Sequence, residues 1–456
     1  MTPGARLQAA VEILETLDVL LPRGEIPADR FLAGYFRSRR YMGSGDRAAV
    51  RAHVYGVLRS WACLDWWLVR NKVPITARSR VIAAQLLVRE NAPEMNLATL
   101  AAHFNGEGYG PTLLSEAERT LAGALEGRTL HHEDQPLLVI ANCPLWLESS
   151  LTRAFGDGLG EEMAAINQTA LLDLRINPLR VSRKEARDIL ACQGVECAVT
   201  PHSPWGLRTK GNVTLSELPA YGKGLVEVQD EGSQLVSLLV AAKPGMRIAD
   251  YCAGAGGKTL ALAAMMEGRG TLVACDVARK RMGDLPSRLK RAGVGNVTLH
   301  VLDENESQKK RGQNWAKRHT RSFDRVLVDA PCSGSGAWRR NPDARWRLSA
   351  ESVAKHAARQ EDILLRAAQL VKPGGRLVYA TCSVLCEENE DVVAAFLAAH
   401  DEFATLSVEN VWVETIATME GGVAFGKILE SGEWLHLTPA RHGCDGFFVA
   451  VMERHG

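Results

Sequence analysis

Residues 246–259 read Met246-Arg247-Ile248-Ala249-Asp250-Tyr251-Cys252-Ala253-Gly254-Ala255-Gly256-Gly257-Lys258-Thr259. The short apolar run that ends at Asp250 is typical of a strand buried in a parallel sheet, and the alanine- and leucine-rich residues 260–266 predict a helix. Glycines between strand and helix let backbone amides close on a ligand, while the helix N-terminus favours negative charge. The stretch therefore predicts an α/β fold that carries a nucleotide-binding turn.

Acidic residues follow the next two predicted strands. Residues 271–275 form an apolar run that ends before Asp276, and residues 297–301 form another that ends near Asp303. An acid after the second strand is placed to accept hydrogen bonds from ribose hydroxyls. Asp303 could reach the edge of an adenine, so the order of turn and acids predicts an adenosine-containing ligand.

Three ligand classes compete for the glycine turn. A dinucleotide fingerprint would need a glycine where Thr259 stands, and the phosphate-binding loop of nucleotide hydrolases would need one where Cys252 stands. S-adenosylmethionine requires glycine amides, a ribose acid and an adenine-edge acid in the order found here, so we favour this cofactor. Its expected contacts are Cys252, Ala253, Gly254, Ala255, Gly256, Gly257, Lys258, Asp276, Asp303 and Asp329.

Two cysteines stand where further apolar strands run out into loops. Cys332 lies in Asp329-Ala330-Pro331-Cys332-Ser333-Gly334 and Cys382 in Thr381-Cys382-Ser383. Ligands of open α/β sheets bind beyond the carboxyl ends of the strands, so both thiols should face one crevice. Buried free cysteine is a common core residue. The proline and serine neighbours of these two instead favour covalent chemistry on a nucleobase, in which thiolate addition to carbon 6 of cytosine activates carbon 5.

From about Glu227 to the C-terminus, the chain resembles the RNA 5-methylcytosine methyltransferases of the Nol1/Nop2/Sun family, especially their bacterial ribosomal RNA branch. The matching stretches are Val228-Gln229-Asp230-Glu231-Gly232-Ser233-Gln234-Leu235, Asp250 to Thr259, Asp329 to Gly334, Thr381-Cys382-Ser383, Glu387-Glu388-Asn389-Glu390 and Cys444-Asp445-Gly446-Phe447-Phe448-Val449-Ala450. The chain departs from the family pattern at Ala255 and Cys386, where proline is common. Neither change removes the backbone amides of the turn.

The resemblance implies the fold class and the domains. Residues 224–456 would form a Rossmann-like class I S-adenosylmethionine-dependent methyltransferase domain. Residues 1–130 would form an all-helical NusB-like RNA-binding domain, and residues 134–223 a small α+β RNA-recognition-like domain.

The resemblance also implies catalytic roles. Cys382 would attack carbon 6, Cys332 would assist release of the methylated base, Asp329 would contact the cytosine amidine edge, and Lys258 would orient the acid or the base edge. The implied activity is methylation of carbon 5 of a cytosine in RNA, with small-subunit (16S) ribosomal RNA as the substrate. A transfer RNA cytosine-5 methyltransferase and an RNA-binding ribosome assembly factor with a vestigial methylase core stay open as alternatives.

Basic residues suggest where RNA would bind. In the N-terminal region arginines gather around Tyr41 and Tyr55. Two further groups could contact RNA because cations pair with phosphates and indoles stack on bases. These are Arg175, Arg180, Arg183 and Lys184 in the middle region, and Lys309, Lys310, Arg311, Trp315, Trp338, Arg339, Arg340, Arg345, Trp346 and Arg347 around the Cys332 loop.

Composition fits a multidomain globular protein. The 456 residues are 46% hydrophobic and 23% charged, with a net charge of +1. No apolar run approaches the ~20 residues of a membrane span, and residues 1–10 lack a signal-peptide pattern. The 10 cysteines form no Cys-x-x-Cys pair, so reduced thiols and no metal site are expected. We therefore expect a cytoplasmic monomer with an RNA partner and no membrane.

Overall fold

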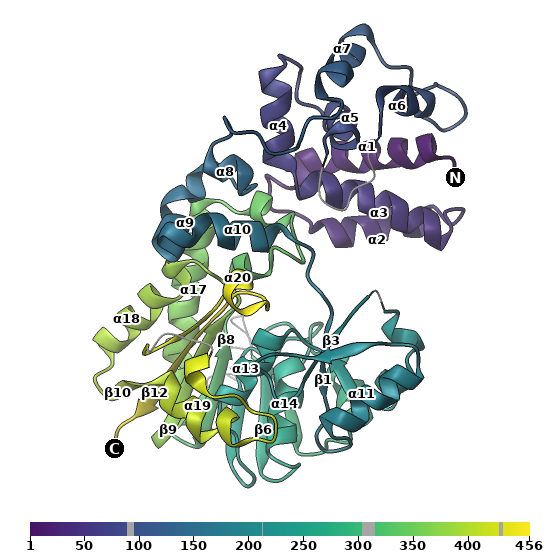
Figure 1. Cartoon of the computed structure of the whole chain (residues 1–456). Helices are drawn as coiled ribbons and strands as arrows, with labels where there is room; N and C mark the ends of the chain where they lie inside the picture. Colours follow the sequence, from purple (N-terminus) through teal and green to yellow (C-terminus); the bar gives the residue numbers. More distant parts are fainter. Residues whose placement is uncertain (89–94, 212, 303–314, 428–431) are drawn as a thin grey trace. The chain divides into compact units, whose positions relative to one another are not determined.

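The computed structural model describes residues 1–88, 95–211, 213–302, 315–427 and 432–456. Asp303, and the predicted RNA contacts Lys309, Lys310 and Arg311, lie outside the described residues. Contacts group the chain into two units. The helical unit comprises Met1–Gln168 and Trp338–Ala350, and the α/β unit comprises Thr169–Ala337 and Glu351–Gly456 (Figure 1).

A large sheet organises the α/β unit. Its strands, in spatial order, are β10 (Phe403–Leu406), β12 (Phe447–Arg454), β9 (Val371–Thr381), β8 (Phe323–Asp329), β5 (Arg247–Asp250), β6 (Thr271–Asp276) and β7 (Val297–Val301), with β11 (Leu435–Leu437) paired to β12. The strands from β7 to β9 are parallel, whereas β12 and β10 are antiparallel. This is the predicted Rossmann-like methyltransferase fold.

The strand order reverses at β5. From β5 the chain builds outward through β6 and β7 on one side, then returns to place β8 and β9 on the other. Ligands of such sheets bind at this switch point, beyond the carboxyl ends of the strands. The ends of β5, β6, β8 and β9 carry Asp250, Asp276, Asp329 and Thr381, so the fold gathers their side chains at one edge.

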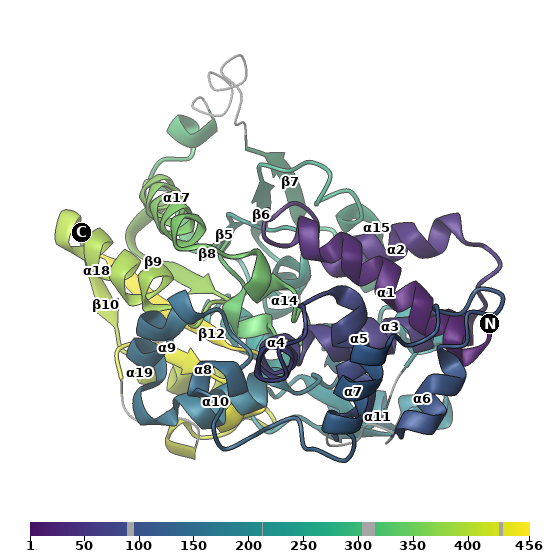
Figure 2. The same cartoon turned by 90° about the horizontal axis from the view of Figure 1, so that it is seen from above.

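Alternating side chains give the sheet two apolar faces. On β9, Val378 and Ala380 pack with α13 (Glu231–Leu239), α14 (Gly257–Met265) and α19 (Val408–Glu414). Leu377 and Tyr379 face the other way, toward α17 (Ala350–Ala368) and α18 (Glu390–Ala399). Figure 2 shows the sheet between α17 and α14. The continuous apolar character of the strands follows from this burial on both sides.

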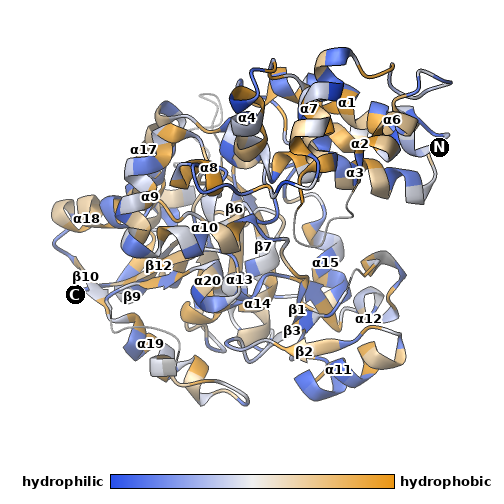
Figure 3. Ribbon diagram, turned by 45° about the horizontal axis from the view of Figure 1, so that its top comes forward, coloured by the Kyte–Doolittle hydropathy of each residue, from blue (hydrophilic) through white to orange (hydrophobic). Residues whose placement is uncertain are grey.

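A smaller antiparallel sheet precedes the large one in the chain. Its strands, in order, are β2 (Cys197–Val199), β3 (Gly206–Thr209), β1 (Asp173–Ile176) and β4 (Val226–Val228). Helix α11 (Arg183–Cys192) lies against this sheet. Figure 3 shows both hydrophilic and hydrophobic residues along the helix. The predicted N-cap of α11 is confirmed: Ser182 and Glu185 form a reciprocal capping box.

The helical unit is built around α1 (Pro3–Leu20), which packs on α3 (Ser44–Leu58) and α5 (Ala77–Leu86). The predicted apolar face of α1, including Leu14 and Leu17, is fully buried. The other helices of the unit are α2 (Ala28–Ser38), α4 (Trp61–Arg70), α6 (Leu97–His103), α7 (Glu116–Leu125), α8 (Leu137–Ile140), α9 (Glu148–Phe155) and α10 (Leu159–Asn167). None of the helices among the described residues is long and apolar enough to cross a membrane.

Helices α8 to α10 group with the helical unit, although the sequence places them in the middle domain. Asn142, just after α8, explains the grouping because its side chain donates to Leu58 O at 3.0 Å and accepts from Ala62 N at 2.8 Å. The division at 1–130, 134–223 and 224–456 stays a prediction about domains.

Candidate active site

The two predicted cysteines lie side by side. Strands β8 and β9 pair in parallel, with Asp329 opposite Ala380, so the loops that follow them leave the sheet together. The Sγ atoms of Cys332 and Cys382 are 3.4 Å apart, and both residues are partly exposed. Two thiols within hydrogen-bonding distance share a proton readily, which fits a nucleophile beside a proton carrier.

The surroundings of Cys332 favour its protonated form. Its hydrogen bond with Cys382, followed by burial and the nearby Glu388 carboxylate, raises the pKa of the Cys332 thiol well above its usual value. These surroundings favour the neutral thiol at Cys332, and either sulfur can be the donor in the pair.

Lys258 and Asp329 form a buried ion pair at the same edge. Lys258 Nζ lies 2.6 Å from Asp329 Oδ2, and Lys258 is only 9% exposed. Burial lowers the pKa of Lys258, but the Asp329 charge and hydrogen bond raise it by more, so its net shift is upward. The pair fixes the Asp329 side chain in one orientation, where it can present its other oxygen to a ligand.

The glycine turn leaves room for a ligand at Gly254. This residue has φ +53° and no atom within 4 Å of the position that a Cβ would take, and its N–H donates to Asp276 Oδ2 at 2.9 Å. Gly256, with φ +84°, packs instead against Leu285, where a Cβ would collide. Asp276 also accepts from Ala278 N at 2.7 Å and is 4% exposed. The strand-end acid is thus held rigidly beside the open part of the turn.

The remaining turn residues are placed mainly by packing. Ala253 N–H donates to Cys275 O at 2.8 Å, Ala255 O accepts from Arg288, and burial raises the pKa of Cys252. Gly257 begins α14, and its carbonyl accepts from Arg175 at 2.7 Å.

One acid of the turn region escaped the sequence analysis as a site residue. Asp250 is fully buried, and burial raises its pKa to about 7 despite a 2.6 Å hydrogen bond from the Thr259 hydroxyl. Its Oδ1 atom has no hydrogen-bond partner among the described residues. A buried acceptor without a donor is costly, so Oδ1 marks an incomplete site at the end of β5.

Distant motifs meet behind the cysteines. Gly336 N–H donates to Cys382 O at 2.9 Å, and Gly446 N–H donates to Gly336 O at 2.9 Å. A Cβ on either glycine would collide with the other backbone. Asp230 caps α13 through Gly232 N–H and also accepts from Asp445 N–H at 3.2 Å. The stretches around 230, 336, 382 and 446 therefore form one packed support for the thiols.

The prediction that the residues after Cys332 contact RNA is wrong for Trp338 and Arg345. Trp338 and Arg345 are both 0% exposed and belong to the helical unit. The Arg345 guanidinium donates to Asn167 Oδ1 at 2.7 Å and to Asn142 O at 3.0 Å, and Trp346 stacks on Trp61. Indole and guanidinium groups can bind nucleic acids, but they can also pack inside a protein. Here they pack inside the helical unit.

Two other predicted RNA contacts are also buried. Arg175 is 3% exposed, and its hydrogen bonds go to Gln229 and the Gly257 carbonyl. Burial lowers its pKa to about 10. Trp315 is 9% exposed and stacks on His300. These side chains support the cofactor turn and the sheet rather than an RNA path.

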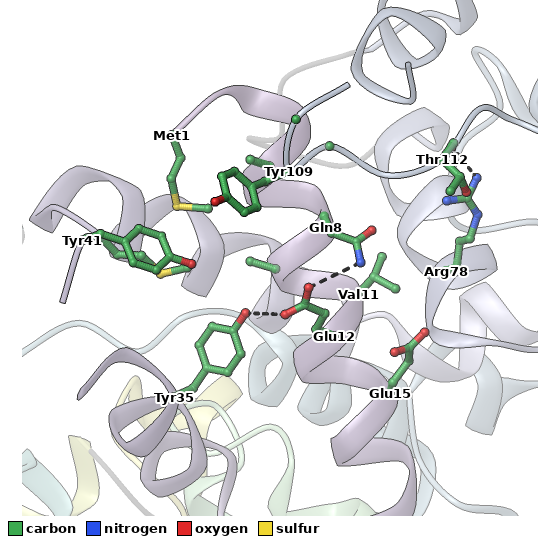
Figure 4. A pocket seen from close by; sticks show the side chains of 15 residues that line it. Met1, Gln8, Val11, Glu12, Glu15, Tyr35, Tyr41, Arg78, Tyr109 and Thr112 are labelled. Carbon is green, nitrogen blue, oxygen red and sulfur yellow. Dashed lines mark hydrogen bonds between the residues drawn. The ribbon is translucent and has the colours of Figure 1, made fainter. Parts of the chain in front are cut away.

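The helical unit contains a pocket of about 450 Å³. Figure 4 shows Tyr41 and Tyr109 to one side of it and Glu12 near its centre, where Tyr35 donates to Glu12 at 2.8 Å. Tyr41 is 71% and Tyr109 is 87% exposed. The pocket contains none of the predicted catalytic residues.

Known proteins match this chain along most of its length. A family model described as 16S rRNA methyltransferase RsmB/F matches residues 237–453, and one described as an RsmF/B-like ferredoxin-like domain matches residues 143–216. The chain is 33% identical to a probable ribosomal RNA small subunit methyltransferase B of Synechocystis sp., over 90% of this chain and 91% of that protein. A protein of the same description from Bacillus subtilis is 31% identical over the same shares, 90% and 91%.

Solved structures agree on the fold. The crystal structure of PH0851 superimposes with a TM-score of 0.72 and 25% identity, covering 100% of this chain and 99% of the other. NSun6 from Pyrococcus horikoshii, solved with SFG, gives a TM-score of 0.57 at 19% identity, covering 69% of this chain and 98% of that one. The chain therefore belongs to the RsmB/Sun-type family of S-adenosylmethionine-dependent methyltransferases of small-subunit ribosomal RNA.

Proposed function

We propose that this methyltransferase modifies carbon 5 of a cytosine in 16S ribosomal RNA through a covalent adduct between Cys382 and carbon 6. The observation that carries the proposal is the 3.4 Å pair of sulfurs beside the Lys258–Asp329 ion pair. Carbon 5 of cytosine is a weak nucleophile, and a sulfur–carbon 6 bond turns it into an enamine-like one. Ribosomal RNA as the substrate would place the enzyme in the cytoplasm.

The residues of the turn fit the cofactor. The turn from Cys252 to Lys258, with the open space at Gly254, and the Asp276 carboxylate would hold S-adenosylmethionine, and the unpartnered Asp250 Oδ1 offers one more acceptor. Asp329 would accept from the cytosine amidine edge, and Lys258 would keep it oriented. When bound, the cofactor supplies an electrophilic methyl group.

The two thiols divide the remaining steps. Cys382 adds as the thiolate, and its sulfur becomes a neutral thioether. The hydrogen bond to Cys382 is the largest cause of the raised pKa of Cys332, so formation of the adduct lowers that pKa. Cys332, after it has released its own proton to solvent, can then take the carbon 5 proton. The electron pair of that carbon–hydrogen bond restores the ring double bond, the sulfur–carbon 6 bond breaks, and Cys382 leaves as the thiolate. Cys332 thus changes from proton holder to base as the reaction proceeds.

Bisulfite sequencing of 16S ribosomal RNA tests the proposal. RNA from cells with the gene should contain one protected cytosine that is missing when the gene is deleted and returns with a plasmid copy. Transfer RNA sequenced in parallel tests the alternative substrate. If the two strains have identical patterns of protected cytosines, and purified protein transfers no methyl group to total RNA, the protein would instead be an RNA-binding assembly factor with a vestigial methylase core.

Cofactor binding gives a separate prediction. Asp276→Ala should weaken S-adenosylmethionine binding by about 1 to 3 kcal/mol, the scale for losing a buried hydrogen-bond partner. Isothermal titration calorimetry measures the change, and Glu267→Ala, which alters an exposed acidic residue, serves as the control. Unchanged affinity in Asp276→Ala would remove Asp276 from the site.

A further inference from the structure

Glu388 lies in the family-like stretch Glu387-Glu388-Asn389-Glu390, to which the proposed reaction gives no role. The residue ends the short helix η6 (Cys386–Glu388) and is 0% exposed. No lysine or arginine pairs with it among the residues that the structure describes. A fully buried acid without a cation is unusual, because burial of a charge is costly unless hydrogen bonds replace its water.

Neutral donors from both cysteine loops surround this carboxylate. Oε1 accepts from Ser333 N at 2.8 Å and from Gln360 Nε2 at 3.2 Å. Oε2 accepts from the hydroxyls of Ser333 and Ser383, each at 2.5 Å. Ser333 follows Cys332 directly and Ser383 follows Cys382 directly, so one side chain binds both loops next to the reactive sulfurs.

Neighbouring contacts make the arrangement rigid. Gln360 Nε2 also donates to Pro331 O at 3.0 Å, which holds the residue before Cys332. The Tyr379 hydroxyl donates to Glu388 O at 2.6 Å and fixes the backbone of the acid. Asn389 accepts from the Thr381 hydroxyl at 2.5 Å and donates to Ser383 O at 3.0 Å. Hydrogen bonds therefore reach the residues on both sides of each cysteine.

We propose that Glu388 is a positioning residue whose buried carboxylate ties the Cys332 loop to the Cys382 loop and sets the separation of the two sulfurs. The catalytic value of this separation rests on the proposed function, whereas the separation itself does not. A carboxylate suits the position because each oxygen can accept two hydrogen bonds. An amide of the same shape would turn one oxygen into a donor that faces two hydroxyls.

The first experiment measures the thiol pair without RNA or cofactor. In a glutathione buffer, Cys332 and Cys382 give two protons and two electrons to one oxidised glutathione, which becomes two reduced glutathione molecules as the disulfide forms. Peptide mass mapping gives the fraction of the full chain that carries this disulfide. Glu388→Gln should lower its equilibrium constant by about tenfold or more, because the sulfurs are no longer held together.

Two further variants separate position from folding and from charge. Ser333→Ala/Ser383→Ala removes both hydroxyl donors but keeps the carboxylate, and should lower the same constant. Glu361→Gln, an exposed change beside Gln360, should leave it at the wild-type value. Thermal unfolding of each protein checks that the α/β unit stays folded. Wild-type disulfide equilibria in both Glu388→Gln and the serine variant would overturn the proposal.

The second experiment measures turnover. Glu388→Gln should lower kcat by about 10- to 100-fold, the scale for misplacing a reacting group, with KM for S-adenosylmethionine near the wild-type value. Loss of the negative charge should also move the pH profile of Cys332 alkylation by iodoacetamide to lower pH, since Glu388 contributes to the raised pKa of that thiol. An unchanged kcat with an unchanged alkylation profile would contradict the role. If wild-type protein methylates no RNA, the proposed function fails, while the disulfide equilibria still decide the role of Glu388.

Discussion

Cys382→Ala should abolish methyl transfer and should form no covalent complex with RNA. Without the Cys382 sulfur no bond to carbon 6 can form, so carbon 5 keeps its low nucleophilicity. Loss of a nucleophile that acts at the first step removes most of the rate enhancement. Incorporation of labelled methyl groups into RNA measures the first effect, and denaturing electrophoresis of protein with RNA measures the second.

Cys332→Ala should show the opposite phenotype. Attack by Cys382 and methyl transfer can proceed, but the proton on carbon 5 then has no thiolate to accept it, so the sulfur–carbon bond persists. A protein–RNA band that survives denaturation should accumulate with cofactor present. Cys192→Ala, which changes an exposed cysteine, should behave as wild type in both assays.

A reversed pattern would exchange the two roles. An adduct in Cys382→Ala, and none in Cys332→Ala, would make Cys332 the nucleophile. Methylation that continues in both variants without an adduct would show that neither thiol reacts, and the 3.4 Å sulfur pair would then be only a packing contact.

Trp338→Ala should lower the free energy of unfolding by about 3 to 5 kcal/mol, the usual cost of emptying a large aromatic site in a core. The Trp338 side chain is 0% exposed, and the Arg345 guanidinium lies over its ring at 4.9 Å. Such a loss is a large part of the total stability of a typical domain. Chemical denaturation followed by circular dichroism measures it.

An exposed tryptophan provides the control. Trp146 is 38% exposed, so Trp146→Ala should change the free energy of unfolding by less than about 1 kcal/mol. At temperatures where Trp338→Ala is still folded, its RNA affinity should equal that of wild type, because the indole does not reach solvent. Normal stability with weakened RNA binding would instead restore Trp338 to an RNA surface.

Local sequence patterns were sufficient for several strands and helices and for the candidate catalytic positions, whose roles stay predictions. The apolar run before Asp250, the glycines after it and the acid after residue 275 follow from periods and spacings within a few residues. Cys332 and Cys382 could be expected at one edge because parallel strands point their carboxyl ends the same way. The cap of α11 by Ser182 and Glu185 was also predictable, because both partners lie within one helical turn of each other.

Burial and long-range partners were decided only by the tertiary structure. Trp338, Arg345 and Arg175 have the residue types of an RNA surface, yet packing against segments far away in the chain removes them from solvent. In the sequence Glu388 is one acid among several. Its partners Ser383 and Ser333 lie about 5 and 55 residues away in the chain. Local periodicity cannot register such contacts, because side-chain burial depends on which distant surfaces the completed fold brings together.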